Sequence, residues 1–206
     1  MRNWVKYILL LAIIALVGYK SVYFKKLSEV RNESKSTTFD ASAYASNFLH
    51  VTLPANLDRA IALSMLDQDL ADSSARAFAY SHAQNNGNTR FFLVKGEGHI
   101  IKIDSEYVYL NVAGVSRKVL LATKYIIGTA ARDGSGLIAV DDFTTTMEMN
   151  TVSEELNKLI RTELLPPFKA SAKTGDLVSF TACLELERNK IVPDSLELIP
   201  LMLNIH

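Results

Sequence analysis

The segment GTAARDGSG, from Gly128 to Gly136, carries the side chains best suited to hold a small ligand. Arg132 and Asp133 lie between glycines that predict a loop, and loops often carry binding residues. The guanidinium of Arg132 could grip a carboxylate or a pair of sugar hydroxyls, because its N–H groups form a planar fork. The same two residues also fit an internal ion pair that fixes a corner of the fold. We favour this structural interpretation.

Other acidic side chains offer oxygen atoms to a ligand or a cation. Asp141, Asp142 and Glu148 could ligate calcium, but their spacing does not match an EF-hand loop. A solvated or helix-capping role is the favoured interpretation for them. Glu97 is flanked by two glycines and could be an acid that a β-bulge exposes, although a bend at a strand edge explains the glycines without chemistry.

Neither a metal centre nor a nucleophilic site is predicted. Cys183 is the only cysteine, so the chain has no internal disulfide, no CxxC motif and no zinc set. The four histidines follow no ligand spacing: His50, His82, His99 and His206. We therefore expect no cofactor, no catalytic residue and no enzymatic activity. A hydrolase or transferase with an unrecognised site is the alternative.

The charge distribution argues against a nucleic-acid-binding protein. Five of the 22 basic residues lie in the first 26 positions, and the remainder has 17 basic and 22 acidic side chains, a net charge of −5. Nucleic-acid binding depends mainly on neutralisation of phosphates by Lys and Arg. One group of aromatic and basic residues favours such a role: Tyr107, Tyr109, Lys102, Arg117, Lys118 and Lys124. We expect no nucleic-acid partner.

The N-terminal segment predicts a membrane anchor. Residues 7–19 are uncharged and almost entirely apolar, but at about 1.5 Å per residue they span only about 20 Å of a hydrocarbon core of about 30 Å. A helix from Trp4 to Phe24 would span about 31 Å, and Tyr7 and Tyr19 would join Trp4 and Phe24 at the two interfaces. A cleaved signal peptide is the alternative, but no A-x-A pattern follows the apolar run.

The chain divides into four parts by composition, and its predicted class is α+β. The anchor occupies residues 1–27, and the polar residues 28–38 predict a tether. Residues 39–88 predict a small helical region, and residues 89–206 predict a β-barrel domain.

Within the helical region, two residues mark helix starts. Asp40 is expected to cap a first helix, and Pro54 is expected in the first turn of another. Leu57, Ile61 and Met65 recur at four-residue spacing, which predicts one buried face of a helix.

Beyond residue 90 the hydrophobic period changes to that of strands. Residues 107–112 alternate Tyr and Asn with Val and Leu. In residues 177–186, alternation predicts two faces because side chains have a period of two along a strand. Val178, Phe180, Ala182 and Leu184 are expected in the core. Cys183 belongs to the other set and is expected outside the main core.

A helix separates the first three strands from the last two. It is expected to begin at about Thr151, with a capping box to Glu154, and to end at Pro166 and Pro167. Three strands, a helix and two strands is the order of an OB-type barrel of five strands, in which the helix lies between strands three and four.

Short motifs along most of the chain after the tether are similar to those of one bacterial family. They are Phe39-Asp40, VKGEG from Val94 to Gly98, GTAARD from Gly128 to Asp133, Asp142-Phe143-Thr144 with Glu148, Leu156-Asn157, and the segment from Gly175 to Phe180 leading to Pro200. In these motifs the chain resembles the predicted periplasmic lipoproteins called domain of unknown function 2291, whose members are most alike in the GTAxRD and DFT segments. The candidate ligand-binding residues are thus Arg132, Asp133, Asp142, Thr144 and Glu97.

The resemblance implies an envelope role close to solute uptake, because such proteins are often encoded beside sugar-type ABC importers. It implies no known activity. We expect a non-enzymatic binding or adaptor module in the bacterial inner membrane, with its folded domain facing the periplasm. The expected partners are membrane lipid and either importer components or a small solute. A structural envelope protein without a ligand is the alternative.

Two departures from the family pattern bear on this expectation. The family's lipid-attachment cysteine is absent, which leaves anchoring to the apolar segment. Thr145-Thr146 replaces the Asn-Gln that usually follows the DFT threonine. If that amide pair contacts a ligand in relatives, the ligand is lost or different here.

Overall fold

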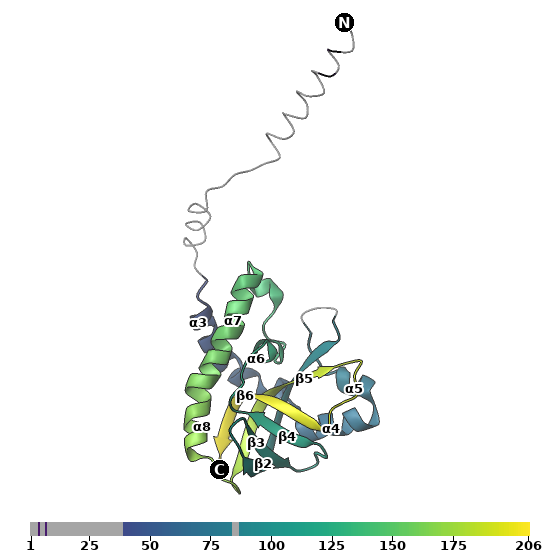
Figure 1. Ribbon diagram of the computed structural model, residues 1–206, viewed down its shortest axis with the longest axis vertical. Coiled ribbons are helices and arrows are strands. Elements are labelled where there is room, and N and C mark those ends of the chain that lie inside the picture. The colour runs from purple at the N-terminus through teal and green to yellow at the C-terminus, as the bar shows by residue number, and fades with distance from the viewer. Residues whose placement is uncertain (1–3, 5–6, 8–38, 84–86) are drawn as a thin grey trace. The chain divides into compact units, whose positions relative to one another are not determined.

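The strands that follow the helical region wrap around a common core. In the computed structural model, which describes Trp4, Tyr7 and residues 39–83 and 87–206, the longest strand is β2 (Thr89–Ile103). It pairs antiparallel with β3 (Tyr107–Val112) and, from Thr89 to His99, with β5 (Leu177–Glu187). Strand β5 is the last strand in the order of pairing. Because it pairs back with β2, the sheet closes between these two strands (Figure 1).

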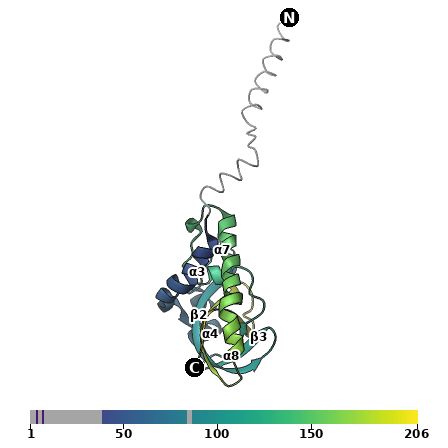
Figure 2. The ribbon, with the colours of Figure 1, turned by 90° about the vertical axis from the view of Figure 1, so that its left-hand side faces the viewer.

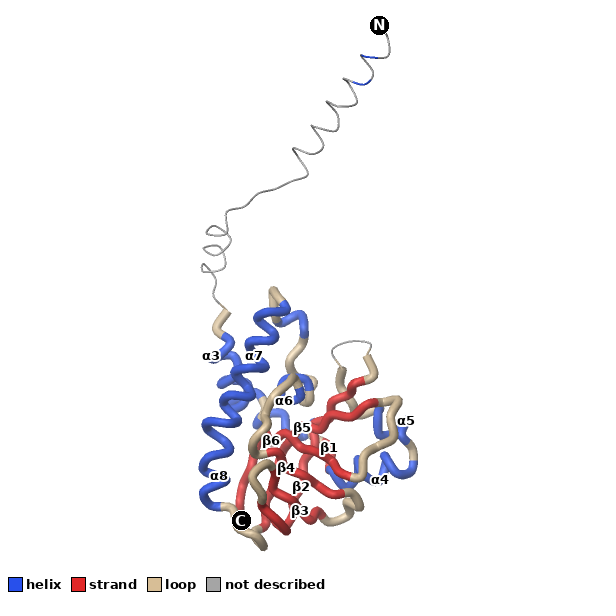
Figure 3. Tube along the Cα trace, viewed as in Figure 1, coloured by secondary structure: helices blue, strands red, loops and turns tan. Residues whose placement is uncertain are grey.

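Two further strands complete the ring. Strand β4 (Lys118–Ala122) pairs antiparallel with β3 and in parallel with β6 (Ser195–Ile205). Strand β6 then pairs antiparallel with β5. The ring β2-β3-β4-β6-β5 therefore matches the predicted order of an OB-type barrel, and Figure 3 shows its strands as one group between two groups of helices.

A sixth strand corrects the predicted number of five. Strand β1 (Ile61–Ala62) pairs in parallel with Val94 and Lys95 of β2. The predicted helical row of Leu57, Ile61 and Met65 is therefore wrong. The backbone is already extended at Ala60 (φ −74°, ψ 126°), where the 3₁₀ helix η2 ends, and Met65 is 49% exposed.

The described part of the helical region, residues 39–83 and 87–88, contains five short helices in place of one periodic stripe. They are α3 (Ala41–Asn47), the π-helical η1 (Phe48–Thr52), the 3₁₀ helix η2 (Pro54–Arg59), α4 (Leu63–Asp72) and α5 (Ser74–Phe78). Asp40 caps α3 as predicted, since its Oδ1 accepts a hydrogen bond from Ala43 N at 2.9 Å. Leu63, Leu66 and Leu70 of α4 supply the buried face that packs on the barrel.

The barrel core has the alternation that the sequence predicts. Along β5, Val178, Phe180, Ala182 and Leu184 are all buried in the core. The predicted bulge at Gly96 or Gly98 is not found there, because the register of β2 against β3 shifts between Ile100 and Lys102. Gly96 is needed for packing instead: a Cβ at this position would lie 2.8 Å from Phe180 Cζ.

The helix between the third and fourth barrel strands is longer than predicted at both ends. It begins as α7 (Thr146–Leu159), continues through the π-helical η4 (Ile160–Leu164) and ends as α8 (Leu165–Ser171). Pro166 and Pro167 lie in the first turn of α8, where the missing N–H of proline costs little, so they do not end the helix. Figure 2 shows this run along one side of the barrel with α3 beside α7.

The start of α7 corrects the predicted capping box. Thr145 Oγ1 accepts from Glu148 N at 3.2 Å, and Glu148 Oε2 accepts from Thr145 N at 3.1 Å. The cap is therefore Thr145, and Thr151 lies inside the helix, where its hydroxyl donates to Met147 O.

Replacing Thr145 with alanine is expected to lower the free energy of unfolding by about 1 kcal/mol, because Glu148 N loses its acceptor. Thr151→Ala is the control, expected to change stability by less than about 0.5 kcal/mol. Urea unfolding followed by circular dichroism measures both. Equal losses at the two positions would contradict the observed helix start.

The predicted anchor and tether lie almost entirely outside the described residues. Residues Asp40–His206 form one compact unit, and of the preceding unit only Trp4, Tyr7 and Phe39 are described. The side chains of Trp4 and Tyr7 are exposed, and Tyr19 and Phe24 are outside the described ranges. Within those ranges, none of the helices has the length and hydrophobicity needed to span a membrane.

Candidate functional site

The GTAARD segment forms a single helical turn, α6 (Ala130–Asp133), that lies against the outer face of β5. The sequence predicted a loop for this segment. Gly128 enters the turn with a positive φ of 79°, which favours glycine. At Gly134 even a Cβ would overlap Cys183 Sγ, so the close approach of α6 to β5 depends on this glycine.

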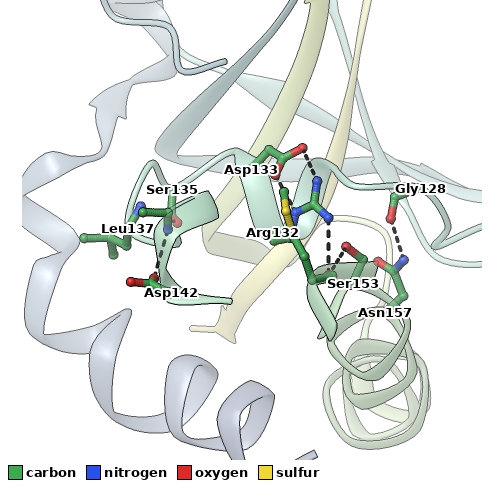
Figure 4. Close-up of polar contacts among 10 residues, drawn as sticks. Gly128, Arg132, Asp133, Ser135, Leu137, Asp142, Ser153 and Asn157 are labelled. Carbon is green, nitrogen blue, oxygen red and sulfur yellow. Dashed lines mark hydrogen bonds and ion pairs between the residues drawn. The ribbon is translucent and has the colours of Figure 1, made fainter. Parts of the chain in front are cut away.

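Arg132 and Asp133 form an internal ion pair at the centre of this turn (Figure 4). Arg132 Nε donates to Asp133 Oδ1 at 2.6 Å, and Nη2 donates to Oδ2 at 2.9 Å. A third bond, from Nη1 to Met149 O at 3.3 Å, ties the turn to α7. Both side chains are buried, with exposed fractions of 4% and 3%. The guanidinium fork thus faces Asp133, in agreement with the favoured structural interpretation.

Cys183 lies outside the main core cluster, as expected, but it is fully buried beneath α6. It does point to the outer face of β5, opposite the core residues, but its exposed fraction is 0%. Burial raises the pKa of the Cys183 thiol far above its usual value, and the nearby Asp133 carboxylate raises it further. A thiol with so little thiolate is a poor nucleophile.

In the folded protein, Cys183 is expected not to react with a thiol-specific reagent, whereas the protein in guanidinium chloride should be labelled fully. Mass spectrometry of the labelled fraction over time measures this difference. Rapid labelling under native conditions would contradict the coverage of β5 by α6.

Asp142 and Thr144 take part in local capping. Asp142 Oδ2 accepts from Ala139 N at 3.0 Å and from the hydroxyl of Tyr44, in α3, at 3.2 Å. Burial, and then the Asp142 carboxylate, raise the pKa of Tyr44 to about 12. Thr144 N donates to Glu148 Oε2 at 2.8 Å. In the described part of the chain, no three His, Cys, Asp or Glu side chains are grouped as metal ligands.

Glu97 is not brought together with the other candidates. It is exposed on β2, opposite Ser179 of β5, and it lines a separate pocket of about 320 Å³ with Lys95 and Asn204.

The aromatic and basic group on β3 and β4 is interleaved with acids. Lys102 lies over the Tyr109 ring and pairs with Asp104 at 3.3 Å, and Lys124 pairs with Glu106 at 3.5 Å. Carboxylates beside these lysines disfavour a polyanionic partner. The absence of a nucleic-acid partner stays a prediction.

A pocket of about 400 Å³ lies beside the entrance to α6. One wall is the segment just before α6, and the other is one face of α7 with the start of η4. The lining residues are Ile126, Ile127, Gly128, Thr129, Asn150, Ser153, Glu154, Asn157 and Arg161. We call this the Gly128 pocket.

Asn157 has an unpaired acceptor in the Gly128 pocket. Its side chain is only 5% exposed, and its Nδ2 donates to Gly128 O at 2.9 Å (Figure 4). Its Oδ1 is buried and has no hydrogen-bond partner among the residues that the structure describes. Ser153, also 5% exposed, donates its hydroxyl to Met149 O at 3.4 Å, so its oxygen can still accept.

The Gly128 pocket contains none of the predicted ligand residues. A signal for it was present in the sequence, since the polar residues 150, 153, 154, 157 and 161 recur at the spacing of one helix face. It was missed because the apolar stripe of Val152, Leu156 and Ile160 on the same helix accounts for the periodicity.

Comparisons with known proteins concern the family and the fold. The family of predicted periplasmic lipoproteins, domain of unknown function 2291, matches residues 12–204. An OB-fold protein from Thermotoga maritima, known from a crystal structure, is similar with a TM-score of 0.73 and 22% sequence identity, over 82% of this chain and 100% of its own. No curated protein matches the chain. At this identity, the structural likeness concerns the fold alone.

Proposed function

Because the chain belongs to the predicted periplasmic lipoproteins of domain of unknown function 2291, we propose that it is a membrane-tethered module that binds a small polar solute in the periplasm. Binding takes place in the Gly128 pocket, without chemical conversion of the solute. The apolar segment from Trp4 to Phe24 is the proposed anchor in the inner membrane, in place of the lipid-bearing cysteine.

The unpaired Oδ1 of Asn157 is the observation that carries this proposal. A buried amide oxygen without a donor costs about 1–3 kcal/mol, so folded proteins rarely keep one unless water or a ligand completes it. Asn157 also lines a pocket of about 400 Å³, a volume within the range of small-molecule sites. The geometry therefore favours a bound solute over a purely structural role.

The Arg132–Asp133 pair has a supporting role in this proposal. It joins α6 to α7 through Met149 O; one wall of the pocket is the segment that leads into α6, and the other is α7 with the start of η4. The pair thereby fixes the distance between the two walls, so it positions the site without touching the solute. The proposed partner of the loaded module is a component of a solute importer or of another envelope assembly at the inner membrane.

A thermal-shift screen of the full chain in detergent tests the proposal. Sugars, amino acids, organic acids and polyamines are added singly, and at least one should raise the unfolding midpoint in a concentration-dependent way. At a ligand concentration about 100 times Kd, the expected stabilisation is about 2.7 kcal/mol. If no solute class shifts the midpoint, the binding proposal fails and a structural envelope role is favoured.

A further inference from the structure

We infer that the solute of the Gly128 pocket is a zwitterionic α-amino acid, an inference that rests on the proposed function and names its ligand class. The hydrogen-bonding groups of the pocket that internal bonds leave unused point to this class. An ammonium group provides three donors, and a carboxylate provides only acceptors. The pocket offers a matching site for each.

The ammonium site consists of three acceptors on α7. Asn157 Oδ1 has no donor within the described chain, and the Ser153 hydroxyl has already donated its proton to Met149 O. Glu154 adds an exposed carboxylate on the same face. Asn157 is three residues from Glu154 and four from Ser153, so in each of these two pairs the side chains are neighbours on the surface of α7, with Cβ atoms about 5–6 Å apart.

The carboxylate site is the guanidinium of Arg161. Its Nη1 donates to Ile126 O, and this bond holds the side chain across the pocket wall. The remaining N–H groups form the planar fork that suits a carboxylate.

Glu154 and Arg161 line the same pocket without neutralising each other. No ion pair joins them in the described part of the structure, although opposite charges seven residues apart lie on one face of a helix. A solute with both charges satisfies the two side chains together. A neutral sugar or polyol leaves both charges unmatched, and a simple anion is repelled by Glu154.

The apolar wall accommodates the amino-acid side chain. Ile127 is 71% exposed and lines the pocket, so an apolar substituent on the solute can cover it.

Titration calorimetry of the full chain in a detergent without a sugar or amino-acid headgroup tests this inference. Each standard L-amino acid is titrated singly, and at least one should give a saturable heat. For the tightest binder, the N-acetyl derivative, which lacks the ammonium, and the primary amide, which lacks the carboxylate, should each bind at least about tenfold more weakly.

Two matched variants place the binding. Glu154→Gln removes an exposed charge from the pocket and should weaken binding about tenfold or more. Glu155→Gln removes the neighbouring charge, which pairs with Lys158 outside the pocket, and should leave the affinity unchanged. Equal affinity in the wild type and Glu154→Gln overturns the inference, as does equal binding of the N-acetyl derivative.

The thermal-shift screen described under the proposed function distinguishes a wrong ligand class from a wrong binding function. If a sugar or another solute shifts the unfolding midpoint and no amino acid binds, the ligand class is wrong and the binding function stands. If no solute of any class binds, both are wrong.

Discussion

Asp133→Ala is expected to lower the free energy of unfolding by about 3–5 kcal/mol, because it leaves the guanidinium of Arg132 buried without its counter-charge. Both groups are almost fully buried, and two of the three hydrogen bonds of Arg132 go to Asp133. Against a total stability of about 5–15 kcal/mol for a domain, this loss is large. Guanidinium chloride unfolding followed by far-ultraviolet circular dichroism measures it.

Two controls separate the buried pair from nonspecific effects. Glu97→Ala removes an exposed acid from β2 and should change stability by less than about 0.5 kcal/mol. The double change of Arg132 to Met and Asp133 to Leu removes both charges, so it should be far less damaging than Asp133→Ala alone. An Asp133→Ala loss below about 1 kcal/mol would be typical of an exposed pair and would contradict the observed burial.

Phe180→Ala is expected to cost about 3–5 kcal/mol through lost burial and a residual cavity. The Phe180 ring lies in the barrel core against Gly96, which has no side chain of its own to fill the space that alanine would leave. Ser179→Ala is the matched control on the opposite face of β5, where the hydroxyl meets only His206 at 2.9 Å, and it should cost about 1 kcal/mol or less. The same unfolding measurement applies.

The comparison of Phe180→Ala with Ser179→Ala tests which residues of β5 face the core. If Ser179→Ala is as damaging as Phe180→Ala, the assignment of the two faces of β5 is wrong. Cys183→Ser, in contrast, is expected to cost more than an exposed change, because α6 covers this position and a buried hydroxyl needs a partner.

Local patterns predict the barrel well because its strands have one face in the core. Along β3, Val108 and Leu110 are buried as the alternation predicts, and along β5 the register of Phe180 is correct. The Asp40 cap could also be predicted, since a cap depends only on residues within one turn.

Predictions that depend on distant packing fail. Met65 lies on the expected buried row but is exposed, because pairing of Ile61 with Val94 ends the helical period before it. Cys183 is covered by α6, which lies about fifty residues earlier in the chain. Alternation identifies its strand face but cannot tell whether another element covers that face.

The candidate site was predicted only in part. Arg132 and Asp133 are adjacent in sequence, so their internal pairing could be considered from the sequence alone. The polar face of α7 has a signal in the sequence, but the unpaired state of Asn157 Oδ1 could not be predicted, because it depends on where Gly128 O lies in space. A hydrogen bond that is missing in the fold has no signature in the sequence.

The most direct test of the account is nuclear magnetic resonance of the full chain in detergent, with ¹⁵N-labelled asparagine and glycine, during titration with small solutes extracted from the periplasm. Signals of the Asn157 side-chain amide and of Gly128 N–H should shift and saturate, because both line the pocket. The side-chain signals of Asn111, on β3, and of Asn204, in the pocket of Glu97, should not move. A saturable shift at Asn204 with none at Asn157, or no shift at all, would contradict the claim that the Gly128 pocket binds the solute.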